Sequence, residues 1–215
     1  MNEVFTIEQL RPIRDSMTVS RDARLVSQTS VTFFSLGMGT SISQECYDND
    51  ALYLGASGGT SFLVGSPPTV HPLSAGELLL VPGGTLCGME TEQGGVYTEI
   101  ISKKEIVMNQ LVKPGEVLRL KDLISYEEGS IANLDVASNE KMKFMLMAFD
   151  EGTGLTPHRA PGNALVFALE GKAIINYEGA DHTLSEGENF HFDKNGLHSV
   201  TADGRFKMAI LLVLD

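Results

Sequence analysis

Short runs of apolar residues recur along the whole chain, and each run has the length of a β-strand rather than of a helix. Turn-forming residues separate the runs, for example at Gly83-Gly84 and Asn195-Gly196, and they suit antiparallel connections. The pattern predicts an all-β sandwich or barrel, with helical turns only near 7-IEQL and 120-LKDL. The runs are 31-VTFFSLG, 51-ALYLGASGG, 60-TSFLVG, 77-ELLLVPGG, 96-VYTEIIS, 143-KFMLMAFD, 163-NALVFALEG, 172-KAIINYEG, 188-ENFHFD and 206-FKMAILLVLD.

The second half of the chain repeats the pattern of the first half. A shift of 113 residues aligns 4-VFTIEQL with 117-VLRLKDL and Gly58 with Gly171. Beyond the loop at residues 66–68 the shift becomes 111 residues, and it then pairs Cys87 with His198. A repeat of this length indicates two similar folding units in tandem.

The boundary between the two copies is marked by Pro114-Gly115, which interrupts the pattern just before the second copy begins. We therefore place the linker at about residues 108–116. The predicted domains are residues 1–110 and 115–215, and each is long enough to bury a core of its own.

The charge of the chain is strongly acidic, with 16 basic and 28 acidic residues and a net charge of −12. Such a field repels nucleic-acid phosphates and anionic membrane surfaces, which disfavours both as partners. Hydrophobic residues make up 42% of the sequence, as expected for a protein with a packed core. The composition favours a small molecule as the partner.

The beginning of the chain predicts a cytoplasmic location, because MNEVFTIEQLRPIRD carries charges where a signal peptide needs an apolar segment. No run of eighteen apolar residues occurs that would predict a membrane-spanning helix. The two cysteines, Cys46 and Cys87, are too few for a disulfide framework and are expected to be free thiols.

Two segments of the second half, 154-GLTPHRAPGNALVFALEG and 187-GENFHFDKNGLHSV, resemble the two motifs of the cupin superfamily. The resemblance implies a double-stranded β-helix jelly roll, so we expect two tandem cupin barrels. In that family the first motif carries His-x-His and a Glu, and the second carries Gly-(Asp/Glu), a strand, Pro and a third His. These four side chains typically hold one divalent metal inside the barrel.

The resemblance places His158 at the first ligand position and His198 at the third. Ala160 and Ala164 replace the second His and the Glu, and Asp193 stands where Pro is usual. Two imidazoles fall short of the three or four protein donors of most metal sites. We expect His158 and His198 to bind a ligand, and they are the candidate ligands of one divalent transition metal in the second barrel.

The first half carries a weaker copy of the second motif at 76-GELLLVPGGTLC, with Cys87 in the place of the histidine. The repeat sets Glu45 against His158, which makes Glu45 and Cys87 the candidate ligand-binding residues of the first barrel. A register different by one residue instead points Gln44, Cys46 and Asp50 inward. Strand alternation makes the two registers mutually exclusive, and we favour the one with Glu45.

The function follows from the resemblance only in outline. The second half resembles small single-domain cupins related to those of pectin and uronate breakdown, which suggests a sugar acid or a similar polar ligand. The first hypothesis is therefore a small-molecule-binding protein that holds this ligand through His158 and His198, with or without metal.

The second hypothesis is a metal-dependent isomerase or ring-opening enzyme acting on a uronate-type sugar. In that case a metal on His158 and His198 polarises a carbonyl while a neighbouring side chain moves a proton. The alanines at positions 160 and 164 favour binding over catalysis. The edge strands and apolar outer faces of jelly rolls also allow a homodimer.

Overall fold

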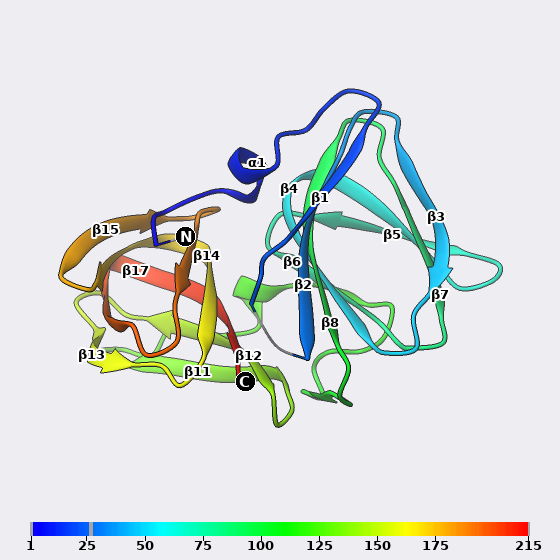
Figure 1. Cartoon of the computed structure of the whole chain (residues 1–215). Helices are drawn as coiled ribbons and strands as arrows, with labels where there is room; N and C mark the ends of the chain where they lie inside the picture. Colours follow the sequence, from blue (N-terminus) through cyan, green and yellow to red (C-terminus); the bar gives the residue numbers. More distant parts are fainter. Residues whose placement is uncertain (1, 26–27, 215) are drawn as a thin grey trace. The chain divides into compact units, whose positions relative to one another are not determined.

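The computed structural model describes residues 2–25 and 28–214 and is built almost entirely of β-strands (Figure 1). The predicted all-β fold class is confirmed. The helical segments are short and lie where the sequence predicts them, as helix α1 (Ile7–Leu10) and the 3₁₀ turn η1 (Leu120–Asp122). No helix among residues 2–25 and 28–214 is long and apolar enough to cross a membrane.

The chain divides into two compact units. The N-terminal unit comprises Ile7–Ile106 and Gln110–Arg119, and the C-terminal unit comprises residues 2–6, Val107–Asn109 and residues 120–214. The first residues of the chain and the segment Val107–Asn109 therefore belong to the C-terminal unit, although they precede most of it in the sequence. Residues 2–6 do so because Phe5 pairs with Asn189 through main-chain hydrogen bonds in both directions, 3.1 and 2.8 Å long.

The N-terminal unit is a barrel whose described strands form one highly bent sheet with the central order β1-β2-β8-β4-β6-β10. Strands β3 and β5 complete it by pairing with β7 and β4, and β7 also pairs with β4. The strands are β1 (Thr18–Asp22), β2 (Thr29–Leu36), β3 (Ser41–Cys46), β4 (Ala51–Val64), β5 (Thr69–Ser74), β6 (Glu77–Val81), β7 (Leu86–Glu90), β8 (Gly95–Ser102) and β10 (Val117–Arg119).

The C-terminal unit is a second barrel, with the order β15-β14-β17-β12-β11-β9 and with β13 on β17 and β16 on β14 in the described residues. Its strands are β9 (Val107–Met108), β11 (Ile131–Ser138), β12 (Met142–Phe149), β13 (Gly154–Arg159), β14 (Asn163–Tyr177), β15 (Ala180–Ser185), β16 (Asn189–Phe192) and β17 (Leu197–Val213).

Each barrel is closed by one long strand that changes partners halfway along. In β4 the change comes at Gly58, which has φ +62°. In β14 it comes at Gly171, which has φ +75°: β16 pairs before it and β15 after it, while β17 stays paired on the other side. A Cβ at Gly171 would lie 2.0 Å from the carbonyl oxygen of Arg205, so only glycine fits this turn. The sequence pattern predicted two strands in each of these places, and a glycine kink joins them into one.

The two barrels have the same strand irregularities in the same register. A β-bulge separates Ile42 from Glu45 in β3, and the corresponding bulge separates Leu155 from His158 in β13. Glu45 then pairs with Cys87, as His158 pairs with His198. The facing pairs expected from the repeat are therefore present, whereas the inward orientation of Glu45 stays a prediction, because Glu45 and Cys46 are both exposed and Gln44 is half-buried.

Candidate functional site

The two histidines singled out by the sequence lie side by side in the C-terminal barrel. They are directly opposite each other on the antiparallel strands β13 and β17, so their side chains share one face of the sheet. Their ring centroids are 4.3 Å apart, with an angle of 56° between the ring planes. His198 is buried, whereas His158 is exposed. One member of the pair is therefore in contact with solvent, and the other lies within the barrel.

Hydrogen bonds fix which nitrogen of each ring carries the proton. Nδ1 of His158 lies 2.8 Å from the Thr156 carbonyl, and Nδ1 of His198 lies 2.9 Å from the Gly196 carbonyl. A carbonyl oxygen only accepts hydrogen bonds, so each Nδ1 carries a proton. When the rings are neutral, each Nε2 is therefore a lone-pair acceptor. The pair presents two acceptors, and each becomes a donor when its ring is protonated.

Aromatic side chains hold His198 in place. Phe192 stacks on its ring with a centroid distance of 4.0 Å and an interplanar angle of 17°. On the other neighbouring strand, Tyr177 is the register partner of His198, and its hydroxyl lies 3.2 Å from Asp193. Burial lowers the pKa of His198 below its ordinary value of 6.5, and the charge of His158 acts in the same direction, while the hydrogen bond to Gly196 opposes them.

The residues of this site do not complete the donor set of a protein-held metal. Within the described ranges, no three His, Cys, Asp or Glu side chains come together in a group that could hold a metal ion. Ala164 at the position of the family's Glu is buried in the apolar core of this barrel. Two imidazoles remain, fewer than the three or four donors that metal sites in proteins usually supply.

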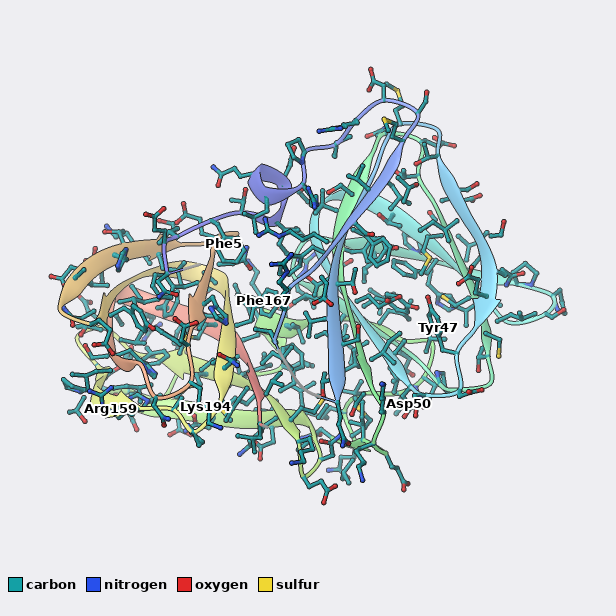
Figure 2. All side chains as sticks on the ribbon, viewed as in Figure 1. Phe5, Tyr47, Asp50, Arg159, Phe167 and Lys194 are labelled. Carbon is teal, nitrogen blue, oxygen red and sulfur yellow. The ribbon has the colours of Figure 1, made fainter. Side chains whose placement is uncertain are left out.

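Arg159, which follows His158, takes no part in the pair. It is exposed, bonds to the main-chain oxygen of Asn195 and forms an ion pair of 3.5 Å with Glu178. Figure 2 shows it at the edge of the C-terminal unit. Because the bulge lies before His158, alternation along β13 sends Arg159 to the opposite face of the strand.

In the N-terminal barrel, the structure brings Glu45 and Cys87 together as register partners. Cys87 is buried, like its counterpart His198 in the other barrel. Glu45 is exposed, like its counterpart His158. Cys46, which the alternative register placed inside, is exposed.

A third acidic residue of the N-terminal barrel, Glu99, is absent from the sequence prediction. It lies on β8 directly opposite Tyr53 of β4 and is only 7% exposed. Burial raises the pKa of Glu99 to about 7. The hydroxyls of Tyr53 and Tyr47 lower this pKa, and the charge of Glu45 raises it further. The signal was present in 96-VYTEIIS, where one carboxylate interrupts an apolar run.

Burial also governs the reactivity of the cysteines. It raises the pKa of Cys87 to about 11, against a lowering by Tyr53 and a further rise from Glu99. At pH 8 such a thiol is ionised in about one molecule in a thousand, and only the thiolate reacts. We expect iodoacetamide to modify Cys46 readily and Cys87 at least about a hundredfold more slowly in the folded protein. Peptide mapping of a labelling time course measures both rates, and equal rates would contradict the buried position of Cys87.

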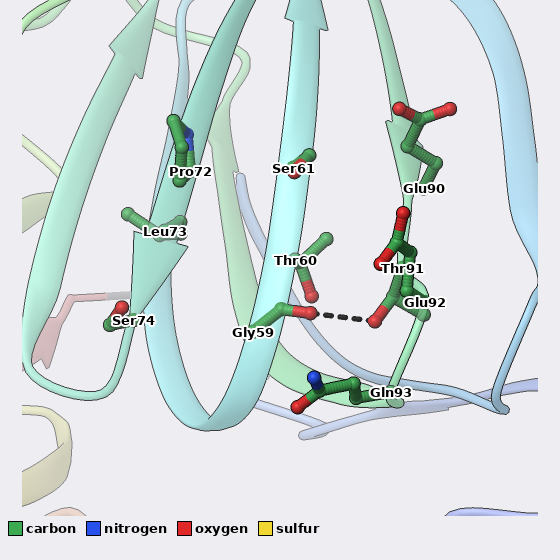
Figure 3. A pocket seen from close by; sticks show the side chains of 10 residues that line it. All are labelled: Gly59, Thr60, Ser61, Pro72, Leu73, Ser74, Glu90, Thr91, Glu92 and Gln93. Atoms are coloured by element: carbon green, nitrogen blue, oxygen red, sulfur yellow. Dashed lines mark hydrogen bonds between the residues drawn. The ribbon is translucent and has the colours of Figure 1, made fainter.

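A pocket of about 260 Å³ lies elsewhere on the N-terminal unit, between the β4–β5 hairpin and the end of β7 (Figure 3). The hydroxyl of Thr91 donates a 2.6 Å hydrogen bond to the Gly59 carbonyl at its wall. None of its lining residues belongs to the histidine pair, and neither Glu99 nor Tyr53 lines it. Its lining residues are Gly59, Thr60, Ser61, Pro72, Leu73, Ser74, Glu90, Thr91, Glu92 and Gln93.

Comparison with known protein families finds a similarity within the second barrel. Residues 145–214 match the family model described as "Cupin domain". The match covers less than half of the chain and spans most of β12 to β17, including His198. Residues 145–214 of the C-terminal unit are thus similar to cupin domains. No curated protein matches the chain.

Solved structures resemble the whole chain. A cupin 2 conserved barrel domain protein from Leptotrichia buccalis superposes with a TM-score of 0.86 at 22% identity, covering 98% of this chain and 96% of that one. Salicylate 1,2-dioxygenase from Pseudaminobacter salicylatoxidans superposes with a TM-score of 0.69 at 12% identity, covering 99% and 84%. A structure of that dioxygenase with gentisate adducts gives the same TM-score and identity, covering 99% and 81%. At these identities the likeness shows the cupin barrel fold alone.

Proposed function

We propose that the C-terminal barrel binds a small polar ligand of the sugar-acid class through His158 and His198. The observation that carries the proposal is the geometry of the pair, in which each Nδ1 donates to a main-chain carbonyl and each Nε2 has no hydrogen-bond partner among residues 2–25 and 28–214. One ring is exposed and the other buried, so a ligand entering from solvent reaches both. The resemblance of the second half to cupins of uronate breakdown supports the ligand class.

The chemistry of the pair suits a ligand that carries both hydroxyl groups and a carboxylate. Neutral imidazoles accept hydrogen bonds from hydroxyls through Nε2, and a protonated imidazole donates a charge-assisted bond to a carboxylate. These residues bind and orient a ligand, and no chemical step is assigned to them.

The binding proposal predicts a specific dependence on pH. Capture of a carboxylate needs imidazolium, and the pKa of His198 is lowered in the free protein. Affinity for D-galacturonate is therefore expected to rise as pH falls from 8 to 5.5, as long as the ligand stays ionised. Binding through a metal has the opposite sign, because it needs neutral imidazole and weakens in acid. Titration calorimetry across this range, with and without EDTA, measures the sign.

Variants of the pair test the proposal more directly. Replacing His198 with Ala is expected to weaken galacturonate binding at least about tenfold, the loss of one charge-assisted hydrogen bond. His182→Ala, in the same barrel but outside the pair, serves as the matched control. D-galactose, which lacks the carboxylate, should bind more weakly than galacturonate to the wild type. Equal affinity of the wild type and a His158→Ala, His198→Ala double variant would remove the pair from ligand binding.

We also propose that the N-terminal barrel is a diverged second cupin domain, so that the chain is a tandem bicupin. The matching bulges before Glu45 and His158 support this, as do the matching kinks at Gly58 and Gly171. A shared origin accounts for irregularities that recur at matching positions of the two barrels.

A further inference from the structure

The interior of the N-terminal barrel contains buried polar atoms that make no hydrogen bond of normal geometry with the described residues, although the hydroxyls of Tyr53 and Tyr47 lie near the Glu99 carboxyl. Tyr53 and Tyr97 are fully buried, and Glu99 is 7% exposed. The hydroxyl oxygens of both tyrosines and Oε2 of Glu99 are buried without a hydrogen-bond partner of normal geometry among the described residues. A buried polar atom left without a partner costs about 1–3 kcal/mol, so such atoms normally face bound water or a ligand.

The barrel fold itself does not require these polar groups. Glu99 pairs with Tyr53 in the register of β8 and β4, and the corresponding pair in the C-terminal barrel is Ile210 with Val166. The same position of the fold is thus apolar in one barrel and polar in the other. A buried carboxyl that the architecture does not need is typical of a binding site, because it lowers stability unless it serves a ligand.

Aromatic rings surround the carboxyl. Tyr97 follows the same strand face as Glu99 and is stacked on Phe34, with centroids 5.1 Å apart. Phe62 lies 4.6 Å from the Tyr53 ring and 5.3 Å from the Tyr97 ring. The faces of such rings attract cations. Aromatic rings and an acidic group together are suited to a ligand that carries a positive charge on a small apolar body.

The charges facing Glu99 have a single sign. Its titratable neighbours are Tyr53 on β4, Tyr97 on β8 and Cys87 on β7, together with Glu45 on β3 and Tyr47 just after it. None of these side chains carries a positive charge. Glu45 is exposed and Tyr47 is half-buried, so this side of the cluster communicates with solvent. Figure 2 shows Tyr47 in the space enclosed by the N-terminal strands.

We propose that this cluster is a second ligand site, in which the Glu99 carboxylate and the surrounding tyrosine rings bind a small organic ammonium ion. The ammonium group donates hydrogen bonds to Oε2 of Glu99 and to the hydroxyl oxygens of Tyr53 and Tyr97. Glu45 attracts the cation at the entrance. The site is separate from the histidine pair in residues, barrel and ligand charge.

The ionisation of Glu99 gives the site a pH dependence. Its pKa of about 7 means that the carboxyl is largely protonated at pH 6 and largely ionised at pH 8. An ammonium ion needs the ionised form, so its apparent affinity is expected to rise about tenfold between these two values. A ligand that accepts a hydrogen bond from the protonated carboxyl would show the opposite trend.

The test uses three probes of one shape: isobutylammonium, isobutanol and isovalerate. Binding is followed in the full chain by NMR of ¹³C-methyl-labelled methionine. Met89 packs in the core of the N-terminal barrel with Tyr53 and Tyr97, and Met208 reports on the C-terminal barrel. We expect isobutylammonium to shift the Met89 signal saturably at pH 8, with no comparable shift from the other two probes and none at Met208.

Conservative variants decide the assignment. Glu99→Gln is expected to weaken isobutylammonium binding at least about tenfold, and Tyr53→Phe about threefold or more. Glu105→Gln, on the exposed surface of the same unit, makes the same charge change and should bind as the wild type does. A double variant of His158 and His198 should also bind normally. Equal binding of the alcohol, or unchanged affinity in Glu99→Gln, would overturn the proposal and leave a water-filled polar core.

Discussion

Replacing Gly171 with Ala is expected to destabilise the C-terminal barrel by more than about 3 kcal/mol. The residue has φ +75°, and its new Cβ would lie 2.0 Å from the Arg205 carbonyl oxygen, a rigid main-chain atom. Relief of this contact requires β14 and β17, which pair with each other on both sides of Gly171, to separate at this point. The whole barrel depends on that crossing, because β14 pairs with β15, β16 and β17.

Gly187→Ala is the matched control. Gly187 also has a positive φ of +84°, but a Cβ there has no atom within 4 Å. The Gly187→Ala substitution should lower the free energy of unfolding by only about 1–2 kcal/mol, because it strains only the left-handed backbone. Urea unfolding followed by the Met208 methyl signal measures both variants. A Gly171→Ala protein no less stable than the control would show that the kink is not where the barrel closes.

Replacing Glu99 with Gln is expected to stabilise the N-terminal barrel at pH 8 and to remove a pH dependence. The folded pKa of about 7 lies above the ordinary value of 4.5, so folding favours the protonated carboxyl. The favourable contribution is present in full below pH 4.5 and is lost as pH rises through 7. The difference between the two pKa values corresponds to about 3 kcal/mol, and the Gln side chain carries no such dependence.

Urea unfolding at pH 5 and pH 8, read from the Met89 methyl signal, measures this effect. The stability of Glu99→Gln relative to the wild type should increase by up to about 3 kcal/mol between the two conditions. Glu105→Gln should show no such increase. A wild type and Glu99→Gln variant with parallel pH profiles would mean that Glu99 has no raised pKa in the folded protein.

Much of the fold was predictable because it depends on local patterns that repeat. Apolar runs of strand length gave the all-β class, and the repeat gave the correct facing pairs, Glu45 with Cys87 and His158 with His198. What the pattern could not show is that two predicted strands are one strand on either side of a glycine. That depends on pairing partners distant in sequence, which apolar periodicity does not encode.

The candidate sites were predictable only where a family resemblance existed. His158 and His198 occupy motif positions and were found, whereas Tyr177 reaches His198 only through the pairing of β14 with β17. Glu99 belongs to no motif, and its character comes from burial and from the neighbouring Tyr53, Tyr47 and Glu45. A carboxylate inside an apolar run was visible in the sequence, but whether it faced the core or solvent depended on the register.

The most direct test of the central claim, that His158 and His198 bind a small polar ligand, is the imidazole ¹⁵N spectrum during titration with D-galacturonate at pH 6. A ligand at the pair changes the Nε2 resonances of both His158 and His198 together, with one affinity, and leaves those of His182 unchanged. Galacturonate that binds without altering either Nε2 signal, or that does not bind at all, would contradict the account.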